Sequence, residues 1–338
     1  MLYSLWVRFA SARDRQSATV AWFPLKSGDR VARRISRLLD NLVSEGVNNL
    51  NMHATLKQMC LVFLGYGLSL VALAAAPLTN AFFAMDTGTR DAAHSSLESQ
   101  FQLVKRLGYD GFGGTLQSAS ELRAQLSLAE RQGIKLTTLY AALDLSSGST
   151  NLPPLLVEAI RLLRDHDTIL WLTVQNSKIK PSDPTGDANA VVVLRELAAG
   201  AAGSRMRIAL YPHTGTWVER VEDAVRLAGA VDRPNVGATF NLCHWLMVDG
   251  QNLDTKLQTA LPFLFVVTIN GADQGGRNWG QLIKPLDQGN YDVAGVVAGL
   301  RRLGYAGPVG LQQYGVGGSA EENLRRSMAA WRKFSAGQ

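Results

Sequence analysis

The feature that most constrains the fold of this chain is a regular alternation of short apolar runs with longer amphipathic runs, from about residue 80 onward. The short runs, rich in β-branched and aromatic residues, are typical of buried strands, and the longer runs are typical of surface helices. Strand followed by helix, repeated along a chain, indicates parallel strands joined by crossover helices. Strands are expected at residues 81–86, 111–115, 135–143, 168–175, 207–212, 236–241, 263–270 and 308–314.

The expected helices have recognisable ends. Gly133 and the Leu-Gly-Tyr triplets at 107–109 and 303–305 place a glycine at a helix C-terminus just before a strand, and Ser118 is a suitable N-cap. Eight such pairs of elements between residues 81 and 335 match the usual size of an α/β protein of the closed (β/α)₈ barrel type, a TIM barrel. The alternative is an open doubly wound sheet, but no Gly-x-Gly-x-x-Gly turn follows the first strand. Helices are expected at about 95–108, 118–132, 153–165, 187–202, 216–230, 252–261, 291–303 and 319–335.

The net charge of +6 is concentrated near the N-terminus, where residues 1–51 hold eight Lys/Arg against four Asp/Glu. Lys57 adds another positive charge, so the rest of the chain is close to neutral. A protein that binds nucleic acid usually carries a basic stripe on its folded domain. We therefore expect no nucleic-acid partner.

An uncharged stretch of 18 residues, 59–76, follows Lys57 and ends in three alanines. A basic start, an apolar centre and a small-residue end are typical of a secretory signal peptide, which Met52 would open. We therefore expect three parts: a leader or mis-assigned extension at 1–51, a signal peptide at 52–76, and a periplasmic or secreted domain at 77–338. A transmembrane anchor is the alternative for the apolar stretch, and residues 31–44 could instead form a basic amphipathic helix.

Cysteines contribute no disulfide to the expected mature domain. Only Cys60 and Cys243 exist, and Cys60 falls within the apolar stretch. Since 46% of the residues are hydrophobic, the domain can build a sufficient core without cross-links. Membrane contact is expected only through the export signal.

Candidate functional residues follow from the fold, because barrels of this kind carry their chemistry at the C-terminal ends of the strands. These positions hold amides, imidazoles and a phenol, with few carboxylates. Such groups can both donate and accept hydrogen bonds, which suits the recognition of a small molecule rich in hydroxyls, such as a sugar. The candidates are Asp86, Gln175, Tyr211, His213, Asn241, His244, Asn270 and Gln312.

Several segments resemble the xylose isomerase-like barrel superfamily, which includes sugar isomerases and epimerases, inosose dehydratases and an AP-endonuclease branch. They are Ala-Leu-Tyr-Pro-His-Thr-Gly (209–215), the stretch from Thr239 to Gly250, Val-Val-Thr-Ile-Asn-Gly-Ala-Asp (266–273) and residues 284–312. The resemblance covers roughly residues 81–335. It implies a TIM barrel that acts on a sugar or keto-sugar by isomerisation, epimerisation or elimination.

The resemblance also implies a divalent metal ion, but the ligand positions differ. Where the family has carboxylates and a histidine, this chain has Tyr211, Asn241, Thr268 and Gln312. Uncharged oxygens do not offset the cost of dehydrating the ion, so we expect no metal and no other cofactor. A weak metal site stays as the alternative.

His213 and His244 persist where relatives contact substrate or assist catalysis, so we expect them to be the general base and acid beside a sugar carbonyl. The alternative for each is a hydrogen-bonded structural histidine. Because all four ligand positions are substituted, a non-catalytic sugar-binding barrel is the second hypothesis. Glycoside hydrolysis would need two opposed carboxylates, for which only Asp86 and Asp144 are available, and a nuclease would need a metal cluster.

Loop residues complete the candidates. The long loop 271–290 suggests a lid, and its Lys284 could bind an anionic group or form a Schiff base. Trp245 and Trp279 could stack on a sugar ring. The glycine-rich stretch 315–319 could hold a phosphate at the start of the last helix.

Overall fold

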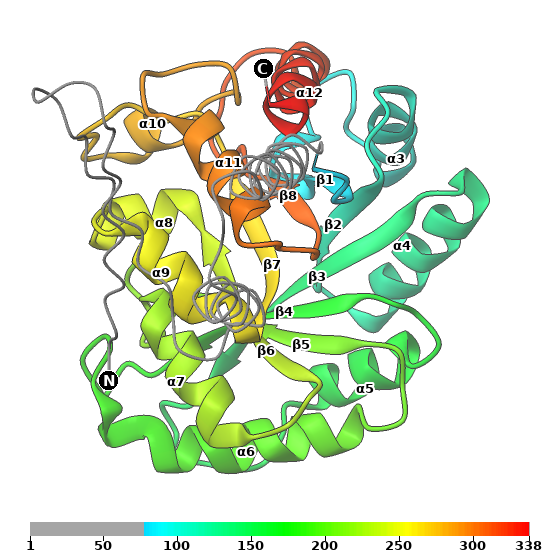
Figure 1. Cartoon of the computed structure of the whole chain (residues 1–338). Helices are drawn as coiled ribbons and strands as arrows, with labels where there is room; N and C mark the ends of the chain where they lie inside the picture. Colours follow the sequence, from blue (N-terminus) through cyan, green and yellow to red (C-terminus); the bar gives the residue numbers. More distant parts are fainter. Residues whose placement is uncertain (1–77, 338) are drawn as a thin grey trace, which may run out of the picture. The chain divides into compact units, whose positions relative to one another are not determined.

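Eight parallel strands form a closed barrel in which each strand pairs with its neighbours in chain order and β8 closes on β1 (Figure 1). A computed structural model of the protein describes residues 78–337. The fold expected from the alternating pattern, a (β/α)₈ TIM barrel, is confirmed. The strands are β1 (Phe82–Met85), β2 (Gly111–Thr115), β3 (Lys135–Asp144), β4 (Ile169–Gln175), β5 (Arg207–Leu210), β6 (Val236–Asn241), β7 (Leu264–Ile269) and β8 (Val309–Leu311).

Helices surround the strands as an outer layer (Figure 1). The structure differs from the expectation mainly in the loops, where α8, α10 and three short 3-10 helices add to the expected set, and β5 and β8 end earlier than expected. The helices are α3 (Leu97–Arg106), α4 (Ala119–Gln132), α5 (Pro154–Leu163), α6 (Asp187–Gly200), α7 (Val221–Val231), α8 (Leu242–Val248), α9 (Leu253–Ala260), α10 (Trp279–Leu282), α11 (Val293–Arg302) and α12 (Ala320–Ala336), with η1 (Asp86–Gly88), η2 (Pro184–Gly186) and η3 (Leu261–Phe263).

The hydrophobic core has two layers, because successive side chains of a strand point to opposite faces. The larger layer lies between the strands and the surrounding helices and includes Phe240 and Trp245. The smaller layer fills the inside of the barrel, where bulky side chains from several strands meet. The inner layer consists of Phe83, Met85, Ile169, Trp171, Ala209, Tyr211 and Val266.

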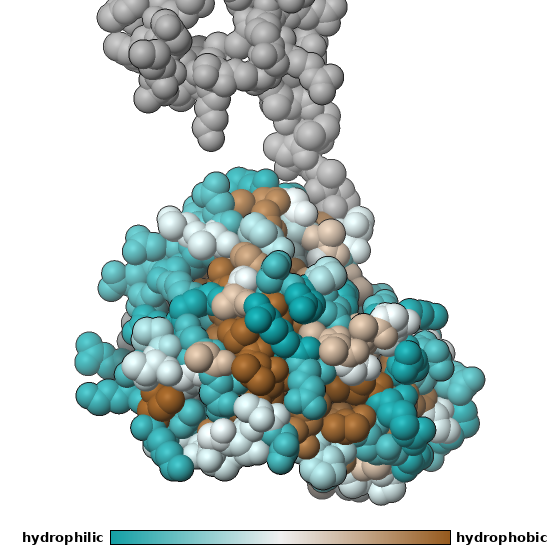
Figure 2. Space-filling model, turned by 90° about the horizontal axis from the view of Figure 1, so that it is seen from below, coloured by the Kyte–Doolittle hydropathy of each residue, from teal (hydrophilic) through white to brown (hydrophobic). Residues whose placement is uncertain are grey.

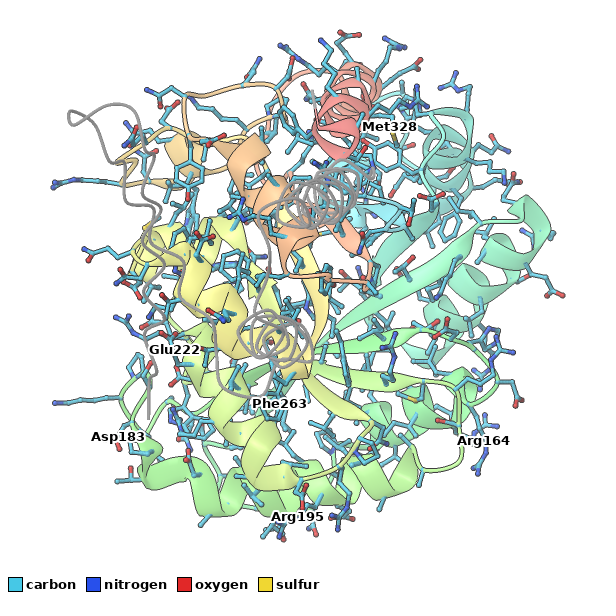
Figure 3. The ribbon with its side chains drawn as sticks, viewed as in Figure 1. Arg164, Asp183, Arg195, Glu222, Phe263 and Met328 are labelled. Atoms are coloured by element: carbon cyan, nitrogen blue, oxygen red, sulfur yellow. The ribbon has the colours of Figure 1, made fainter. Side chains whose placement is uncertain are left out.

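Helix ends in the structure follow the signals in the sequence. The Ser118 side chain accepts a hydrogen bond from Glu121 N at the start of α4, and Gly133 ends that helix at a φ of 58°. Arg195 of α6, labelled in Figure 3, donates to the carbonyls of Ala230 and Val231, so it stabilises the C-terminal end of α7.

The N-terminus of α12 is already paired with an acidic side chain. Asp91 Oδ2 accepts a 2.8 Å hydrogen bond from Ala320 N, and Ser319 caps the same turn. A carboxylate therefore takes the place at which a phosphate would meet the backbone N–H groups behind 315–319. This arrangement argues against the phosphate site suggested by the glycine-rich stretch.

The face in Figure 2, toward which α5 and α6 lie, is largely hydrophilic with separate hydrophobic patches. Val157 of α5 and Val192 of α6 are exposed on these helices. Among the described residues, no helix combines the length and the apolar character needed to span a bilayer. The expected leader (1–51) and signal peptide (52–76) lie outside the described residues.

Candidate active site

Tyr211 forms the floor of the candidate site at the C-terminal end of the barrel. It directly follows β5, points into the barrel, and stacks on Trp171 with ring centroids 4.2 Å apart. Its hydroxyl accepts a 2.7 Å hydrogen bond from Asn241 Nδ2 and also pairs with the side chain of Gln312. Burial raises the pKa of Tyr211 well above its usual value, so the phenol is neutral.

Asn241 holds two parts of the site together. As the last residue of β6 it points inward to Tyr211, and its Oδ1 accepts hydrogen bonds from His244 N and from the Cys243 thiol. Those bonds make Asn241 the N-cap of α8, a helix that the sequence pattern alone did not predict. Burial raises the pKa of Cys243 to about 12, so the thiol stays protonated.

The two expected histidines meet above Tyr211. The His213 and His244 ring centroids lie 4.0 Å apart, and both rings contact Tyr211 edge-on, at 5.8 and 5.6 Å. His244 is only 5% exposed, whereas His213 is half-buried. The structure thus brings together two side chains that are 31 positions apart in the sequence numbering.

Both imidazoles are neutral near pH 7. Burial lowers the pKa of His244 to about 2, and the adjacent His213 adds to this effect. Burial also lowers the pKa of His213, partly offset by a hydrogen bond to the carbonyl of Thr214. The pair therefore lacks the charge of an imidazolium and works through one lone pair and one N–H on each ring.

The residues at the family's metal-ligand positions do not fit a divalent ion. The Asn241 amide is engaged with Tyr211, His244 and Cys243, and Gln312 Oε1 accepts from Thr87 Oγ1 and Tyr314 N. A divalent ion prefers carboxylate or imidazole ligands. In this set the Asn241 and Gln312 oxygens already accept hydrogen bonds, and the buried Thr268 Oγ1, which has no partner among the described residues, is a single uncharged oxygen. Within residues 78–337 no three His, Cys, Asp or Glu side chains gather in a way that could hold a metal.

Asp86 and Gln175, two other expected site residues, lie at strand ends and are only partly buried. Asp86 is half-buried, burial raises its pKa, and hydrogen bonds from Thr115 and Thr87 partly oppose that shift. Gln175 is half-buried at the end of β4, and no hydrogen bond of its side chain is seen in the described part of the chain. Among the expected site residues at strand ends, these two side chains are less buried than Asn241, Asn270 and Gln312.

Asn270 has a structural partner. It is fully buried, and its Nδ2 donates to the carbonyls of Gly271 and Leu282, which ties the start of the following loop to the end of α10. Its Oδ1 finds no hydrogen-bond partner among the described residues. Its place is at the base of the loop rather than at the open part of the mouth.

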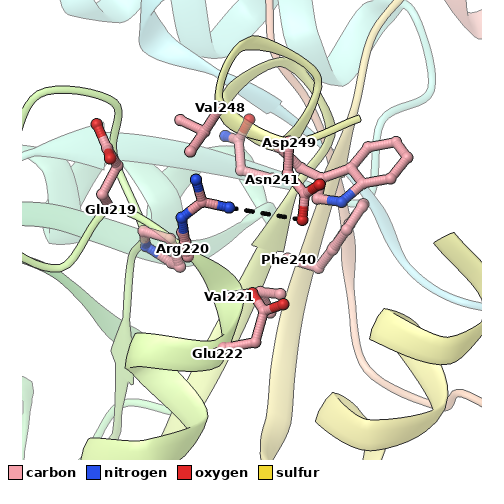
Figure 4. A pocket seen from close by; sticks show the side chains of 10 residues that line it. Glu219, Arg220, Val221, Glu222, Phe240, Asn241, Val248 and Asp249 are labelled. Carbon is pink, nitrogen blue, oxygen red and sulfur yellow. Dashed lines mark ion pairs between the residues drawn. The ribbon is translucent and has the colours of Figure 1, made fainter. Parts of the chain in front are cut away.

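Trp245 lies on the other side of the sheet from the imidazoles, and this corrects the expectation of a stacking face. It packs against Phe240, with centroids 5.7 Å apart, in the layer between strands and helices. There it lines a cleft with room for about one water, beside the ion pair of Arg220 and Asp249 (Figure 4). The physical reason is the helical geometry of α8, in which successive side chains diverge, so that His244 faces the histidine pair and the next residue, Trp245, faces Phe240.

Trp279 is the tryptophan at the site. The half-buried ring starts α10 in the long loop and meets the His244 ring edge-on at 5.2 Å. Its ring thus lies beside the histidine pair and is partly open to solvent.

Lys284 is held within the loop. It forms an ion pair with Asp273, and its backbone pairs with Gly271 in an antiparallel bridge. A lysine already paired with a carboxylate is poorly suited to form a Schiff base, which needs a neutral amine. The loop is thus pinned at its base by Asn270 and by this ion pair.

Two other places in the barrel could have held a functional site: the carboxylates near the mouth, and a cavity at the opposite end. Asp144 is exposed and accepts hydrogen bonds from Ser146, so it is engaged away from Asp86. Besides burial, the carboxylate whose charge raises the pKa of Asp86 is Glu121, in the first turn of α4. A cavity of ≈ 550 Å³ lies at the opposite, N-terminal end of the barrel, lined by Lys135, Asp167 and Arg207 among others. It lacks the histidines, and that end of such barrels serves stability rather than chemistry.

A comparison with protein families identifies the family of this barrel. The family model of the xylose isomerase-like TIM barrel matches residues 101–334. The chain belongs to this family. The resemblance found in its sequence motifs is thereby confirmed.

Several solved structures share this fold over most of the chain. D-allulose 3-epimerase from Methylomonas sp. in complex with D-allulose has a TM-score of 0.61 at 15% identity, covering 77% of this chain and 99% of that one. The 3-keto-D-glucoside 4-epimerase from E. coli has a TM-score of 0.60 at 17% identity, with 75% and 100% covered. The probable 3-DHS dehydratase from Bacillus anthracis has a TM-score of 0.59 at 16% identity, with 75% and 97% covered.

At these identities the xylose isomerase-like structures establish the shared fold alone. No sequence among the curated proteins matches the chain significantly.

Proposed function

We propose that this protein is a sugar-modifying enzyme that moves a proton on the carbon next to a sugar carbonyl, without a metal ion. The single observation that carries the proposal is the contact of two neutral imidazoles, 4.0 Å apart, above a neutral buried floor at the barrel mouth. This is the place where barrels of this architecture bind and transform small molecules.

The reaction would use His213 and His244 as base and acid. One imidazole accepts the proton as the C–H bond breaks, and the electron pair forms a carbon–carbon double bond. The carbonyl oxygen receives the displaced pair and a hydrogen bond or proton from the second imidazole. Return of the proton to the former carbonyl carbon gives an isomer, and delivery of a solvent-derived proton to the opposite face gives an epimer. Loss of a neighbouring hydroxyl as water, with a proton from an imidazole, gives an elimination product.

The substrate class follows from the polar but weakly charged mouth. Asp86 and Gln175 are half-buried with capacity to bind hydroxyls, and Trp279 offers an apolar face beside His244. Asn241, Asn270 and Gln312 serve mainly within the protein, so they would support the site rather than make most substrate contacts. The sugars in the titles of the structural neighbours, D-allulose and a 3-keto-D-glucoside, are suitable first probes.

A non-catalytic sugar-binding barrel is the second candidate. The observation in its favour is that Tyr211, Asn241 and Gln312 bond to one another at the family's ligand positions, as expected if the ion's role was lost. Such a protein would bind the sugar and leave its protons in place.

Deuterium exchange separates the two candidates. We would incubate the protein with D-allulose or a 3-keto-D-glucoside in D₂O and follow deuterium beside the carbonyl by NMR, with calorimetry for binding. Exchange that falls by about 10²–10⁴ in His213→Ala and His244→Ala supports the enzyme. The exposed His166→Ala is the matched control. Binding without exchange favours the binder, and absence of both refutes a sugar function.

We also propose export to the periplasm or outside the cell, from the apolar stretch at 59–76. N-terminal sequencing of the protein purified from its natural source tests this. A start near residue 77 supports cleavage, and retention of residues 59–76 in a membrane fraction favours an anchor.

A further inference from the structure

Thr214 touches both histidines of the site through its own backbone. Its N–H donates to His244 Nδ1 at 3.2 Å, and its Oγ1 lies 3.1 Å from the same nitrogen. Its carbonyl oxygen lies 3.0 Å from His213 Nδ1. One residue thus faces the Nδ1 atom of each ring, with a donor on one side and an acceptor on the other.

These contacts determine which ring nitrogen carries hydrogen. A backbone N–H can only donate, so His244 Nδ1 must be the bare nitrogen, and its hydrogen sits on Nε2. A carbonyl oxygen can only accept, so His213 Nδ1 must carry the hydrogen, and its Nε2 keeps a free lone pair. Within residues 78–337, neither Nε2 atom forms a hydrogen bond. Neither belongs to the fully buried polar atoms without a partner in this part of the chain, so both keep some solvent exposure.

We infer that Thr214 is a positioning residue that gives the two histidines different roles in the proposed reaction. His213 Nε2 is the base that takes the proton from carbon, and His244 Nε2–H is the donor that meets the carbonyl oxygen. The inference rests on the proposed function for its chemistry, although the arrangement of hydrogens can be measured without it. A neutral imidazole N–H thereby supplies the polarisation that relatives would obtain from an ion.

A tight turn holds Thr214 in this position. The turn consists of residues 213–216, and the His213 carbonyl accepts a 3.0 Å hydrogen bond from Thr216 N. Gly215, the third residue of the turn, has a φ of 83°. Thr214 itself is not among the positive-φ residues, so the turn is type II, with Thr214 at its second position. Gly215 is required here because an L side chain strains that conformation.

The turn type provides a selective variant. Proline is favoured at the second position of a type II turn, so Thr214→Pro is compatible with the turn and keeps the carbonyl. It removes the N–H and the hydroxyl, and its Cδ, which replaces the hydrogen that faces His244 Nδ1, also displaces that ring. Thr214→Val removes the hydroxyl alone, and Thr214→Ser keeps every contact. These three changes separate the backbone donor from the side chain.

The experiment is ¹⁵N NMR of the full-length protein labelled at histidine, with the five histidines assigned through His→Gln variants. We expect His213 as the Nδ1–H form and His244 as the Nε2–H form, unchanged in Thr214→Ser and Thr214→Val. In Thr214→Pro the Nε2–H fraction of His244 should fall, His213 should stay as it was, and deuterium exchange on the keto-sugar probe should drop by about tenfold or more.

Two results would overturn the assignment. One is the same hydrogen-bearing nitrogen in both rings of the wild type, and the other is an unchanged His244 in folded Thr214→Pro. If Thr214→Pro does not fold, the wild-type spectrum decides alone, because it shows either opposite or identical forms. Opposite forms without any exchange on sugar would refute the proposed function and leave the assignment of hydrogens standing.

Discussion

The hydroxyl of Tyr211 accepts a 2.7 Å hydrogen bond from Nδ2 of Asn241, across neighbouring strand ends of the barrel. Tyr211 is 2% exposed and Asn241 is 3% exposed, so the bond is sealed from solvent. Two groups that could have faced a ligand therefore face each other. Burial keeps the phenol neutral, and the bond engages an amide that could otherwise have met a cation or a ligand.

Tyr211→Phe should cost stability and leave sugar binding nearly intact. Removal of the hydroxyl leaves the buried Asn241 amide without its acceptor, which costs about 1–3 kcal/mol. The free energy of unfolding from denaturant titration and the Kd from calorimetry check the two halves of the prediction. Tyr305→Phe, which removes a hydroxyl bonded to Pro308 O at the other end of the barrel, is the matched control. A Kd at least tenfold weaker in Tyr211→Phe alone would mean that the hydroxyl contacts the sugar.

Chelation should leave the activity unchanged. Since the oxygens of Asn241 and Gln312 are committed to protein donors, we expect less than about 0.1 equivalent of divalent metal per chain, given the ligand preferences of such ions. Metal analysis of the purified protein and exchange rates before and after EDTA provide the measurement. A stoichiometric ion whose removal abolishes exchange would contradict the prediction.

Stability should fall as the pH is lowered from 7 to 5, because of His244. Its pKa is lowered to about 2 in the folded protein, against an ordinary value of 6.5, so below pH 6.5 the unfolded chain binds a proton that the folded protein refuses. The stabilisation is thus present above pH 6.5 and is lost as the pH falls, by about 2 kcal/mol at pH 5.

Denaturant titrations at pH 5 and pH 7 measure this slope in the wild type and in His244→Gln. The variant should lose the part of the difference that His244 contributes and keep a smaller slope of the same sign from His213, whose pKa is also lowered. His166→Gln should keep the full difference, because His166 is exposed. An equal slope in wild type and His244→Gln would show that His244 titrates normally.

Lys284 should act through Asp273 rather than through a ligand. Both side chains are partly exposed, so the ion pair contributes about 1 kcal/mol or less to holding the loop. We expect Lys284→Gln and Asp273→Asn to change the sugar Kd by the same small factor, and the double variant to add nothing further. Calorimetry on the three variants tests this, and a large loss in Lys284→Gln alone would indicate an anion-binding lysine.

Much of the architecture could be predicted from local patterns. The alternation of strand and helix, the cap at Ser118 and the glycine at 133 all report on interactions within a few residues, and the structure confirms the barrel that they imply. The expectation that polar strand-end residues gather at one end follows from parallel topology alone. The boundaries were less certain, since β5 ends at Leu210 and α8 begins at once after Asn241.

The details of the site depended on side chains that are distant in the sequence. Trp245 and Trp279 had equal standing as stacking residues, and only the packing of α8 against Phe240 and of α10 against His244 distinguishes them. Nothing in the sequence marked Thr214 as a functional residue, because the Thr-Gly pair at 214–215 indicates only a turn. Its importance lies in contacts to His244, 30 positions away.

The sequence by itself determined the barrel, the family and the pairing of His213 with His244 near one rim, because periodicity and strand order are local properties that topology converts into position. Only the tertiary structure decided which polar groups bind one another, as Tyr211 binds Asn241, and which ring nitrogens stay free. Those outcomes depend on distances of about 3 Å between distant segments, and a hydrogen bond is directional enough that such distances decide the chemistry.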